Sequence, residues 1–178
     1  MSGETGVFPE MFPAFAVRGG AMNRKKRGGY MAAPSRFGYC AQTVCLHCAS
    51  RLGISDAQAI GMASALGTGM GHAEICGCIS GAHLVLGLYY GSADTMEEGK
   101  LKKPVLLEKV AEFERRFSEK QPHRMCRDML GMDITQPGVM REAAEKGLFV
   151  SVCREMTQRT CEILADMLDE DAKGPALR

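Results

Sequence analysis

The segment from Ile75 to Tyr90 constrains the fold of this chain more than any other. It reads ICGCISGAHLVLGLYY, is apolar on all sides of a helix, and contains three glycines. A helix that is apolar all round is buried, and this one is too short and too rich in glycine for a membrane span. We therefore predict a buried central helix whose glycines allow close approach of neighbouring helices.

The residues before this segment predict two more helices. Cys40–Leu52 contains no helix-breaking residue and is followed by Gly53, a typical helix-ending residue. Ser55 and Gln58 have the spacing of a capping box, which predicts a second helix that stops at the glycine at position 67. A short connection of this kind pairs the two helices in a hairpin.

The residues after the central segment predict a further series of helices. Pro104 opens a strongly amphipathic one, with Val105, Phe113 and other apolar residues on one side. The others are expected at 124–130, 137–146 and 148–168, the first two ended by glycine. Since no run of β-branched residues alternates with turns, the predicted fold is all-α, an irregular helical bundle around the glycine-rich central helix.

We expect one domain in this 178-residue chain. Residues 38–170 form the predicted helical, cysteine-rich redox domain. Residues 1–37 contain Gly, Pro and the basic run NRKKRGG without a sustained period, which predicts a flexible or loosely docked N-terminal arm. Residues 171–178 are expected to be a C-terminal tail.

Charge and cysteine usage indicate the compartment and the class of partner. With 22 Lys and Arg against 21 Asp and Glu, we expect no binding to nucleic acid and none to membranes. The sequence does not open with a charged region followed by an apolar run, so we expect the cytoplasm. There, eight cysteines indicate metal or redox chemistry more than disulfides, although several can be buried packing residues.

Common catalytic motifs are absent from the sequence. Residues 67–71 (GTGMG) follow a predicted helix and lack the GxGxxG spacing of a dinucleotide site. The sequence also lacks GxSxG, HExxH and Walker A motifs. The chemistry is therefore expected to reside in cysteines, and whether the chain is an enzyme stays open.

The cysteines are not equivalent. Cys45 and Cys48 share one helical face, but a thioredoxin-type thiol lies at a helix N-terminus, where Cys40 is expected instead. Packing and chemistry both remain open for that pair. On one helix Cys76 and Cys78 would point about 200° apart, so we assign Cys76 to the site and Cys78 to the core.

Two histidines lie near Cys76 in the sequence. His83 would be on nearly the same helical face but about 10 Å along the axis, too far to share one metal ion. Three roles remain open for His83: it supports the site, contacts a partner or packs in the core. His72 and Glu74 precede Cys76 and make zinc a minor alternative.

Taken together, these residues resemble a redox-active protein family named for its pattern of Cys, then Gly-Cys-Ala-x-x-Gly, then Cys, then Cys. The resemblance covers about residues 39–168. Where related sequences read Cys-Gly-Ala, this chain has Cys78 in place of the alanine. Cys45, Cys48 and Cys161 are further extras. The matching motifs are YCAQ at 39–42, GTGMG at 67–71, CGCISG at 76–81, GLYYG at 87–91, CRDMLG at 126–131 and CRE at 153–155.

The resemblance implies a small helical redox protein with Cys40, Cys76, Cys126 and Cys153 as cofactor-binding and metal ligands. A similar segment accompanies haem in split-Soret cytochromes, where it is linked to an iron–sulfur centre. Soft thiolates select iron–sulfur clusters or zinc. We therefore expect an iron–sulfur cluster that serves electron transfer or redox sensing. The sequence does not specify the type of cluster.

Two alternatives stay open. One is a metal-free thiol–disulfide oxidoreductase in which Cys40 attacks and a nearby cysteine resolves the mixed disulfide. The other is a non-catalytic partner of a larger redox enzyme. In each case a redox partner protein is expected, and a homodimer stays open.

Overall fold

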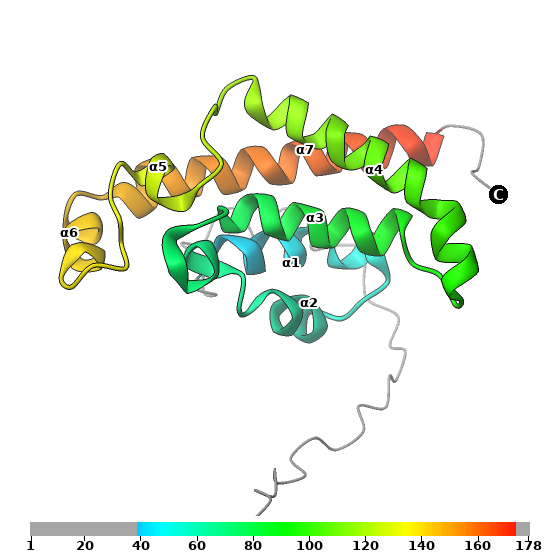
Figure 1. Cartoon of the computed structure of the whole chain (residues 1–178), viewed down its shortest axis with the longest axis horizontal. Helices are drawn as coiled ribbons and strands as arrows, with labels where there is room; N and C mark the ends of the chain where they lie inside the picture. The colour runs from blue at the N-terminus through cyan, green and yellow to red at the C-terminus, as the bar shows by residue number, and fades with distance from the viewer. Residues whose placement is uncertain (1–38, 174–178) are drawn as a thin grey trace, which may run out of the picture.

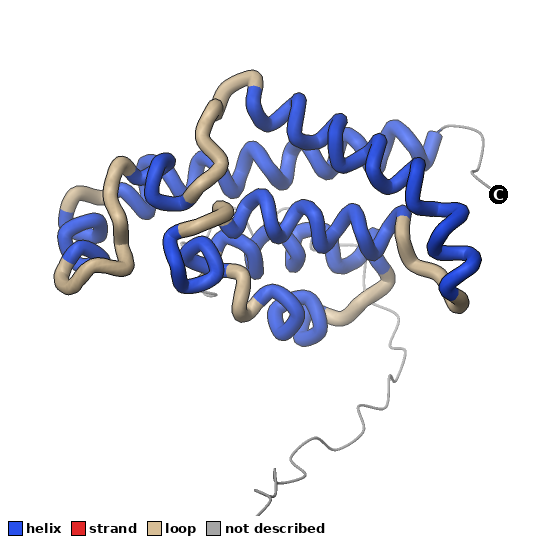
Figure 2. The backbone as a smooth tube through the Cα atoms, in the orientation of Figure 1, coloured by secondary structure: helices blue, strands red, loops and turns tan. Residues whose placement is uncertain are grey.

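The structure, a computed structural model, describes residues 39–173, and helices make up most of this part of the chain (Figures 1 and 2). Among these residues there is no strand, so the all-α prediction is confirmed. The elements in chain order are α1 (Cys40–Leu52), α2 (Asp56–Ala63), the π-helical turn η2 (Gly69–Ala73), α3 (Gly77–Tyr90), α4 (Met96–Ser118), α5 (Cys126–Leu130), α6 (Val139–Glu145), the π-helical turn η3 (Phe149–Cys153) and α7 (Arg154–Lys173).

The two predicted terminal segments are only partly covered by the structure. The predicted arm, residues 1–37, lies outside the described residues, as does the chain after Lys173. α7 continues to Lys173 and so takes up the first residues of the segment that we expected as a tail. No helix between residues 39 and 173 is both long enough and apolar enough to cross a membrane.

The predicted central helix is confirmed as α3. It packs against α1, α4 and α7, and Figure 1 shows it in the middle of the bundle. Ile79 and Leu86 are among its fully buried side chains. At Gly81 an added Cβ would lie 3.0 Å from the Cα of Ala41, so this glycine allows the backbones of α1 and α3 to approach closely.

α3 begins at Gly77, two residues later than predicted. Ile75 forms an isolated antiparallel bridge with Met125, which holds the chain extended before the helix. Cys76 then caps α3 with φ −56° and ψ 136°, outside the helical region. The sequence of this segment alone carries no sign of the bridge, because the partner is distant in sequence.

The helical hairpin of α1 and α2 has the predicted signals at its turn. Gly53 ends α1 with φ 68°, and Ser55 and Gln58 form the capping box. α2 nevertheless ends at Ala63, before the predicted stop at position 67. The amides of residues 64 and 66 bond to carbonyls three positions earlier, which tightens the chain into turns and brings Leu66 back onto the core.

The prediction that Pro104 opens a helix is wrong. α4 begins at Met96, where Thr95 accepts a hydrogen bond from the backbone amide of Glu98. Pro104 therefore lies inside the helix and removes one backbone bond. The residues around it are exposed, so water can satisfy the carbonyl of Lys100. The N-terminal cap and the acidic first turn outweigh the proline.

The C-terminal elements follow the predicted order. α5 and α6 lie within their predicted ranges, and Gly131 and Gly147 follow them with φ 63° and 70°. The closing helix is divided: η3 takes its first turn, and α7 forms the rest. Cys153 is the last residue of η3, directly before α7.

The apolar residues form two clusters. The main core lies between α1, α3, α4 and α7. A second apolar cluster is built around Ala73, Cys126, Leu130, Ile134 and Ala143, and Val152 packs against both clusters. Figure 1 shows α5 and α6 together at one end of the molecule, beyond the start of α3.

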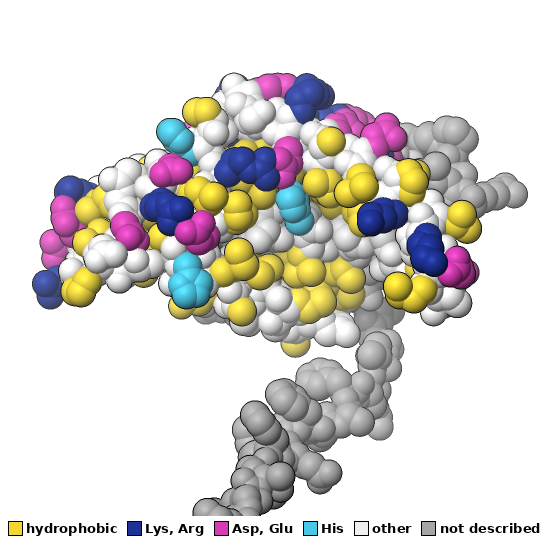
Figure 3. All heavy atoms as spheres, viewed as in Figure 1, with side chains coloured by type: hydrophobic (Ala, Val, Ile, Leu, Met, Phe, Trp, Pro, Cys, Tyr) yellow, Lys and Arg dark blue, Asp and Glu magenta, His cyan; other side chains and the backbone are white. Residues whose placement is uncertain are grey.

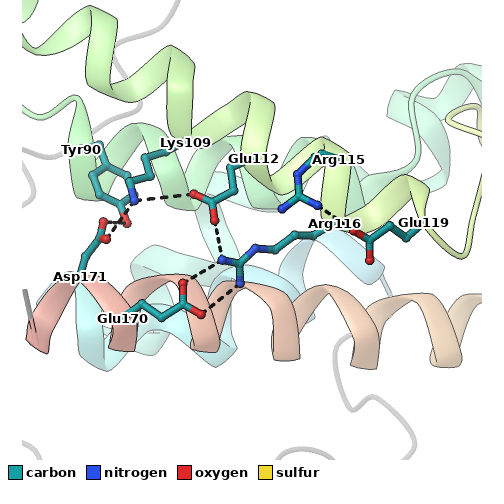
Figure 4. Close-up of polar contacts among 8 residues, drawn as sticks. All are labelled: Tyr90, Lys109, Glu112, Arg115, Arg116, Glu119, Glu170 and Asp171. Carbon is teal, nitrogen blue, oxygen red and sulfur yellow. Dashed lines mark hydrogen bonds and ion pairs between the residues drawn. The ribbon is translucent and has the colours of Figure 1, made fainter.

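Charged side chains of both signs are mixed over the face shown in Figure 3. Many form ion pairs between elements, such as Arg124 with Glu114 and Arg127 with Glu74. At the C-terminal ends of α3 and α7, the Tyr90 hydroxyl donates to Asp171 at 2.7 Å and Lys109 Nζ lies 2.9 Å from the same carboxylate (Figure 4). These contacts join three helices at the end away from α5 and α6.

Candidate functional site

Three cysteines come together where α1 and α3 begin. Cys40 is the first residue of α1, Cys76 caps α3, and Cys78 is the second residue of α3. Their sulfurs all lie within 4.8 Å of one another. Within residues 39–173, no other set of three or more His, Cys, Asp or Glu side chains forms such a compact group of potential metal ligands. We call these three residues the thiol cluster.

Gly77 makes the contact between the two helices possible. A Cβ at this position would lie 2.7 Å from the Sγ of Cys40, closer than real Cβ contacts. It would also lie 3.1 Å from the carbonyl oxygen of Leu66 and 3.2 Å from the amide nitrogen of Ala41. Only a residue without a side chain fits between these atoms and leaves the Cys40 sulfur in place.

The expectation that Cys78 points away from Cys76 is wrong. Its side chain is fully buried, as expected, but its sulfur also belongs to the thiol cluster. The expected 200° separation requires that Cys76 be helical, and Cys76 is instead extended. That conformation turns the Cys76 side chain toward the same point as Cys78.

The thiol cluster favours one negative charge, centred on Cys40. Hydrogen bonds from the thiols of Cys76 and Cys78 hold the pKa of Cys40 well below its usual range, and the backbone amide of Ala41 adds to this effect. The pKa values of Cys76 and Cys78 are raised, first because each donates to Cys40. The N-terminal ends of α1 and α3 both face this charge, and a helix N-terminus stabilises an anion.

Cys126 and Cys153 lie near the thiol cluster without joining it. Cys126 is the first residue of α5, and both residues belong to the second apolar cluster. Burial raises the pKa of Cys126 to about 11 and that of Cys153 to about 12, and the charge of Cys40 contributes to both shifts. These two thiols are therefore within electrostatic reach of Cys40.

Backbone and side-chain contacts tie the two groups of cysteines together. The amide of Cys76 donates to the carbonyl of Arg124 at 2.9 Å, and the amide of Cys126 donates to the carbonyl of Glu74 at 2.6 Å. Thr157 on α7 provides a second link. Its Oγ1 lies 3.4 Å from the Sγ of Cys78 and donates to the Cys153 carbonyl at 2.7 Å.

The remaining cysteines lie in the main core. Cys45, Cys48 and Cys161 are almost completely buried, and the thiol of Cys45 donates to the carbonyl of Gly81 at 3.7 Å. Burial raises the pKa of Cys45 to about 11 and those of Cys48 and Cys161 to about 12. Such thiols are protonated at neutral pH and serve as small packing residues.

The histidines do not complete a metal site in the described part of the chain. No compact ligand group there includes a histidine, and Glu74 pairs with Arg127 at 2.6 Å. His83 Nε2 lies 2.9 Å from Glu114, and its ring contacts the edge of Phe113. His83 is thus engaged with α4 rather than with the thiol cluster.

A comparison with protein families agrees with the sequence motifs. Residues 38–167 match the family described as "Putative redox-active protein (C_GCAxxG_C_C)". This chain belongs to that family. No curated protein matches it, and no solved structure does. The description of the family as redox-active agrees with the presence of the thiol cluster, which could hold a metal ion.

Proposed function

We propose that this protein carries out electron transfer or redox sensing through an iron–sulfur cluster bound at the start of α3. The proposed ligands are Cys40 and Cys76 from the thiol cluster together with Cys126 and Cys153. An iron–sulfur cluster would supply reversible one-electron chemistry. The chain's own contribution is to gather the thiols, to bury them and to exclude water.

The observation that carries the proposal is the convergence of thiols from separate helices. Cys40 and Cys76 are distant in sequence, yet their sulfurs lie within 4.8 Å of each other at two helix N-termini. Metal centres bound by thiolates are anionic, so the positive ends of α1 and α3 favour such a centre. Soft sulfur donors in a buried site select iron or zinc over hard cations.

Cys126 and Cys153 support the iron–sulfur form of the proposal. Each lies at or directly before the start of a helix, and the charge of Cys40 contributes to the raised pKa of each thiol. A centre between the thiol cluster and the second apolar cluster would take ligands from both groups. Zinc at the same thiols is a minor alternative because zinc also favours four thiolates.

Anaerobic purification tests this proposal. We expect a brown protein that contains iron and acid-labile sulfide, and Cys→Ser substitution at positions 40, 76, 126 and 153 should each lower the iron content strongly. Cys161→Ser is the matched control. Because Cys161 is buried in the main core, this variant should retain its iron. Colourless protein without iron or sulfide, even after reconstitution, would contradict the proposal.

A second candidate function is favoured by the low pKa of Cys40. As a metal-free thiol–disulfide oxidoreductase, the Cys40 thiolate would attack a substrate disulfide, form a mixed disulfide and release one substrate thiolate. The thiol of Cys76 or Cys78 would then lose its proton and displace the second substrate thiol, which leaves an intramolecular disulfide. A reversible loss of two thiols per chain upon mild oxidation of metal-free protein would support this candidate.

The partner is proposed to be another redox protein. This proposal follows from the chemistry of the site alone, since electrons or disulfides must be passed to a second molecule. If all the cysteines proved dispensable for redox behaviour, a non-catalytic role beside a larger redox enzyme would remain.

A further inference from the structure

We propose that Cys78 is itself a direct ligand of the metal in this chain, with Cys40 and Cys76, and that Thr157 is its positioning residue. This inference rests on the proposal that the thiol cluster binds metal. It concerns a single ion held by these three sulfurs, as zinc would be held, and it adds a sulfur that the family pattern does not include. The alanine expected at this position in related sequences would offer no ligand.

The sulfur positions support ligation of one ion by all three cysteines. In a tetrahedral thiolate site with metal–sulfur bonds of about 2.3 Å, the sulfurs lie about 3.8 Å apart. The three sulfurs of the thiol cluster already lie within 4.8 Å of one another. Small side-chain rotations would therefore bring all three to bonding distance of one ion.

The surroundings of Cys78 also fit a metal-bound thiolate. Its side chain is completely buried. A thiolate in such a place needs a cation or hydrogen-bond donors, because burial without a partner strongly disfavours charge. A core residue whose only role is packing needs neither.

Thr157 provides a hydrogen-bond partner for the Cys78 sulfur. Its hydroxyl proton is directed to the Cys153 carbonyl at 2.7 Å, and its Oγ1 lies 3.4 Å from the Cys78 sulfur. Once the thiol has lost its proton, the hydroxyl can rotate and donate to the sulfur. Thr157 thereby fixes the Cys78 sulfur from α7.

Anaerobic titration of the reduced full chain with cobalt(II) alone tests this inference, because thiolate-to-cobalt charge-transfer absorption reports how many sulfurs bind. Cys78→Ala should reduce this absorption and weaken cobalt binding by more than about 10-fold. Cys161→Ala, the matched control with an equally buried thiol outside the cluster, should leave both unchanged.

Thr157→Val provides a second comparison that does not alter a cysteine. It should weaken cobalt binding by about 10-fold while the number of bound thiolates stays the same. Thr160→Val is its control: Thr160 is also buried on α7 and also donates to the carbonyl four residues earlier, but that bond goes to Met156. This pair decides the question if Cys78→Ala does not fold, as judged by circular dichroism.

The outcomes separate this inference from the proposed function. If wild-type protein shows thiolate–cobalt absorption that Cys78→Ala leaves unchanged, Cys78 is only a core residue while the metal centre stands. Equal affinities of Thr157→Val and Thr160→Val would overturn the role of Thr157. If wild-type protein binds no cobalt through thiolates, this inference fails, while the iron and sulfide content of anaerobically purified protein still decides the proposed function.

Discussion

At the scale of single residues, the missing side chain of Gly77 is what lets two helices bring their thiols together. Gly77→Ala would place a methyl group 2.7 Å from the Cys40 sulfur, with backbone atoms of neighbouring segments at 3.1 and 3.2 Å. The Cys40 sulfur must therefore move. We expect metal affinity to fall by about 10-fold or more and stability to fall by about 1–3 kcal/mol.

Gly87→Ala is the matched control for this substitution. Gly87 lies in the same helix, and an added Cβ would meet nothing within 4 Å. Alanine is the better helix former by about 1 kcal/mol, so this variant should be as stable as wild type or more stable, with unchanged metal binding. Urea unfolding and metal titration measure both effects. Equal behaviour of the two alanine variants would show that the close packing at Gly77 is unimportant.

The pH dependence of Cys40 reactivity gives a second prediction. Because its pKa is lowered by donated hydrogen bonds, Cys40 in metal-free, reduced protein should react with iodoacetamide as a thiolate at a lower pH than an ordinary cysteine. Cys76→Ala removes the strongest of these donors and should shift the rate profile to higher pH. Peptide mapping identifies the labelled residue. A profile unchanged by Cys76→Ala, as in the Cys161→Ala control, would contradict this explanation.

Sequence reasoning grouped Cys40 with Cys76, and the structure brings their sulfurs together, but it separated Cys78 from them. The helical wheel that separated Cys76 from Cys78 assumes that both residues are helical, and the bridge between Ile75 and Met125 removes Cys76 from the helix. Thr157 left no recognisable signal, because its contact with Cys78 spans 79 residues. An extra cysteine at a small-residue position was the only available hint.

At the scale of elements, the local signals between α1 and α2 predict their turn correctly, whereas element ends that depend on distant contacts are missed. Gly53 and the capping box of Ser55 and Gln58 are local, and they mark the turn between α1 and α2 correctly. The end of α2 depends on Leu66 packing back onto the core, and the start of α3 on a bridge to Met125. Neither contact can be read from the neighbouring residues.

Pro104 in α4 gives a prediction at this scale. A proline inside a helix removes a backbone hydrogen bond and costs up to about 3 kcal/mol. Since Pro104 is exposed, Pro104→Ala should restore this bond without disturbing the core and raise the free energy of unfolding by about 1–3 kcal/mol. Lys103→Ala, an exposed neighbour, should change it by less than about 0.5 kcal/mol. If the proline variant were the less stable of the two, α4 would not be continuous through this position.

At the scale of the whole molecule, the thiol cluster and the contacts of Asp171 with Tyr90 and Lys109 lie near opposite ends of α3. α3 has 14 residues, about 21 Å of helix, and separates Cys76 at its start from Tyr90 at its end. The end with the thiol cluster contains extended backbone, short helices and buried thiols. The opposite end contains ion pairs and hydrogen bonds that hold α3, α4 and α7 together.

Asp171 tests whether the two ends are independent. Burial opposes its ionisation, but hydrogen bonds from Lys109 and Tyr90 outweigh burial and lower its pKa. A carboxyl group whose pKa is lower in the folded state contributes stability that is present above its unfolded pKa of about 3.9 and is lost as the pH falls through the folded value. Asp171→Asn should therefore destabilise the protein at pH 7, by about 1–3 kcal/mol, and flatten the loss of stability below about pH 4.

The metal affinity of Asp171→Asn shows whether the two ends of the bundle are independent. Asp171→Asn should leave metal affinity and thiolate number unchanged, because its contacts reach only the C-terminal ends of α3 and α7 and the middle of α4. Glu97→Gln is the control for stability. Both side chains of the ion pair between Glu97 and Lys100 are exposed, so the pair contributes little to the free energy of unfolding. Urea unfolding at pH 7 and below pH 4, combined with cobalt titration, measures both properties. A parallel loss of metal affinity would mean that the bundle transmits changes along its length to the thiol cluster.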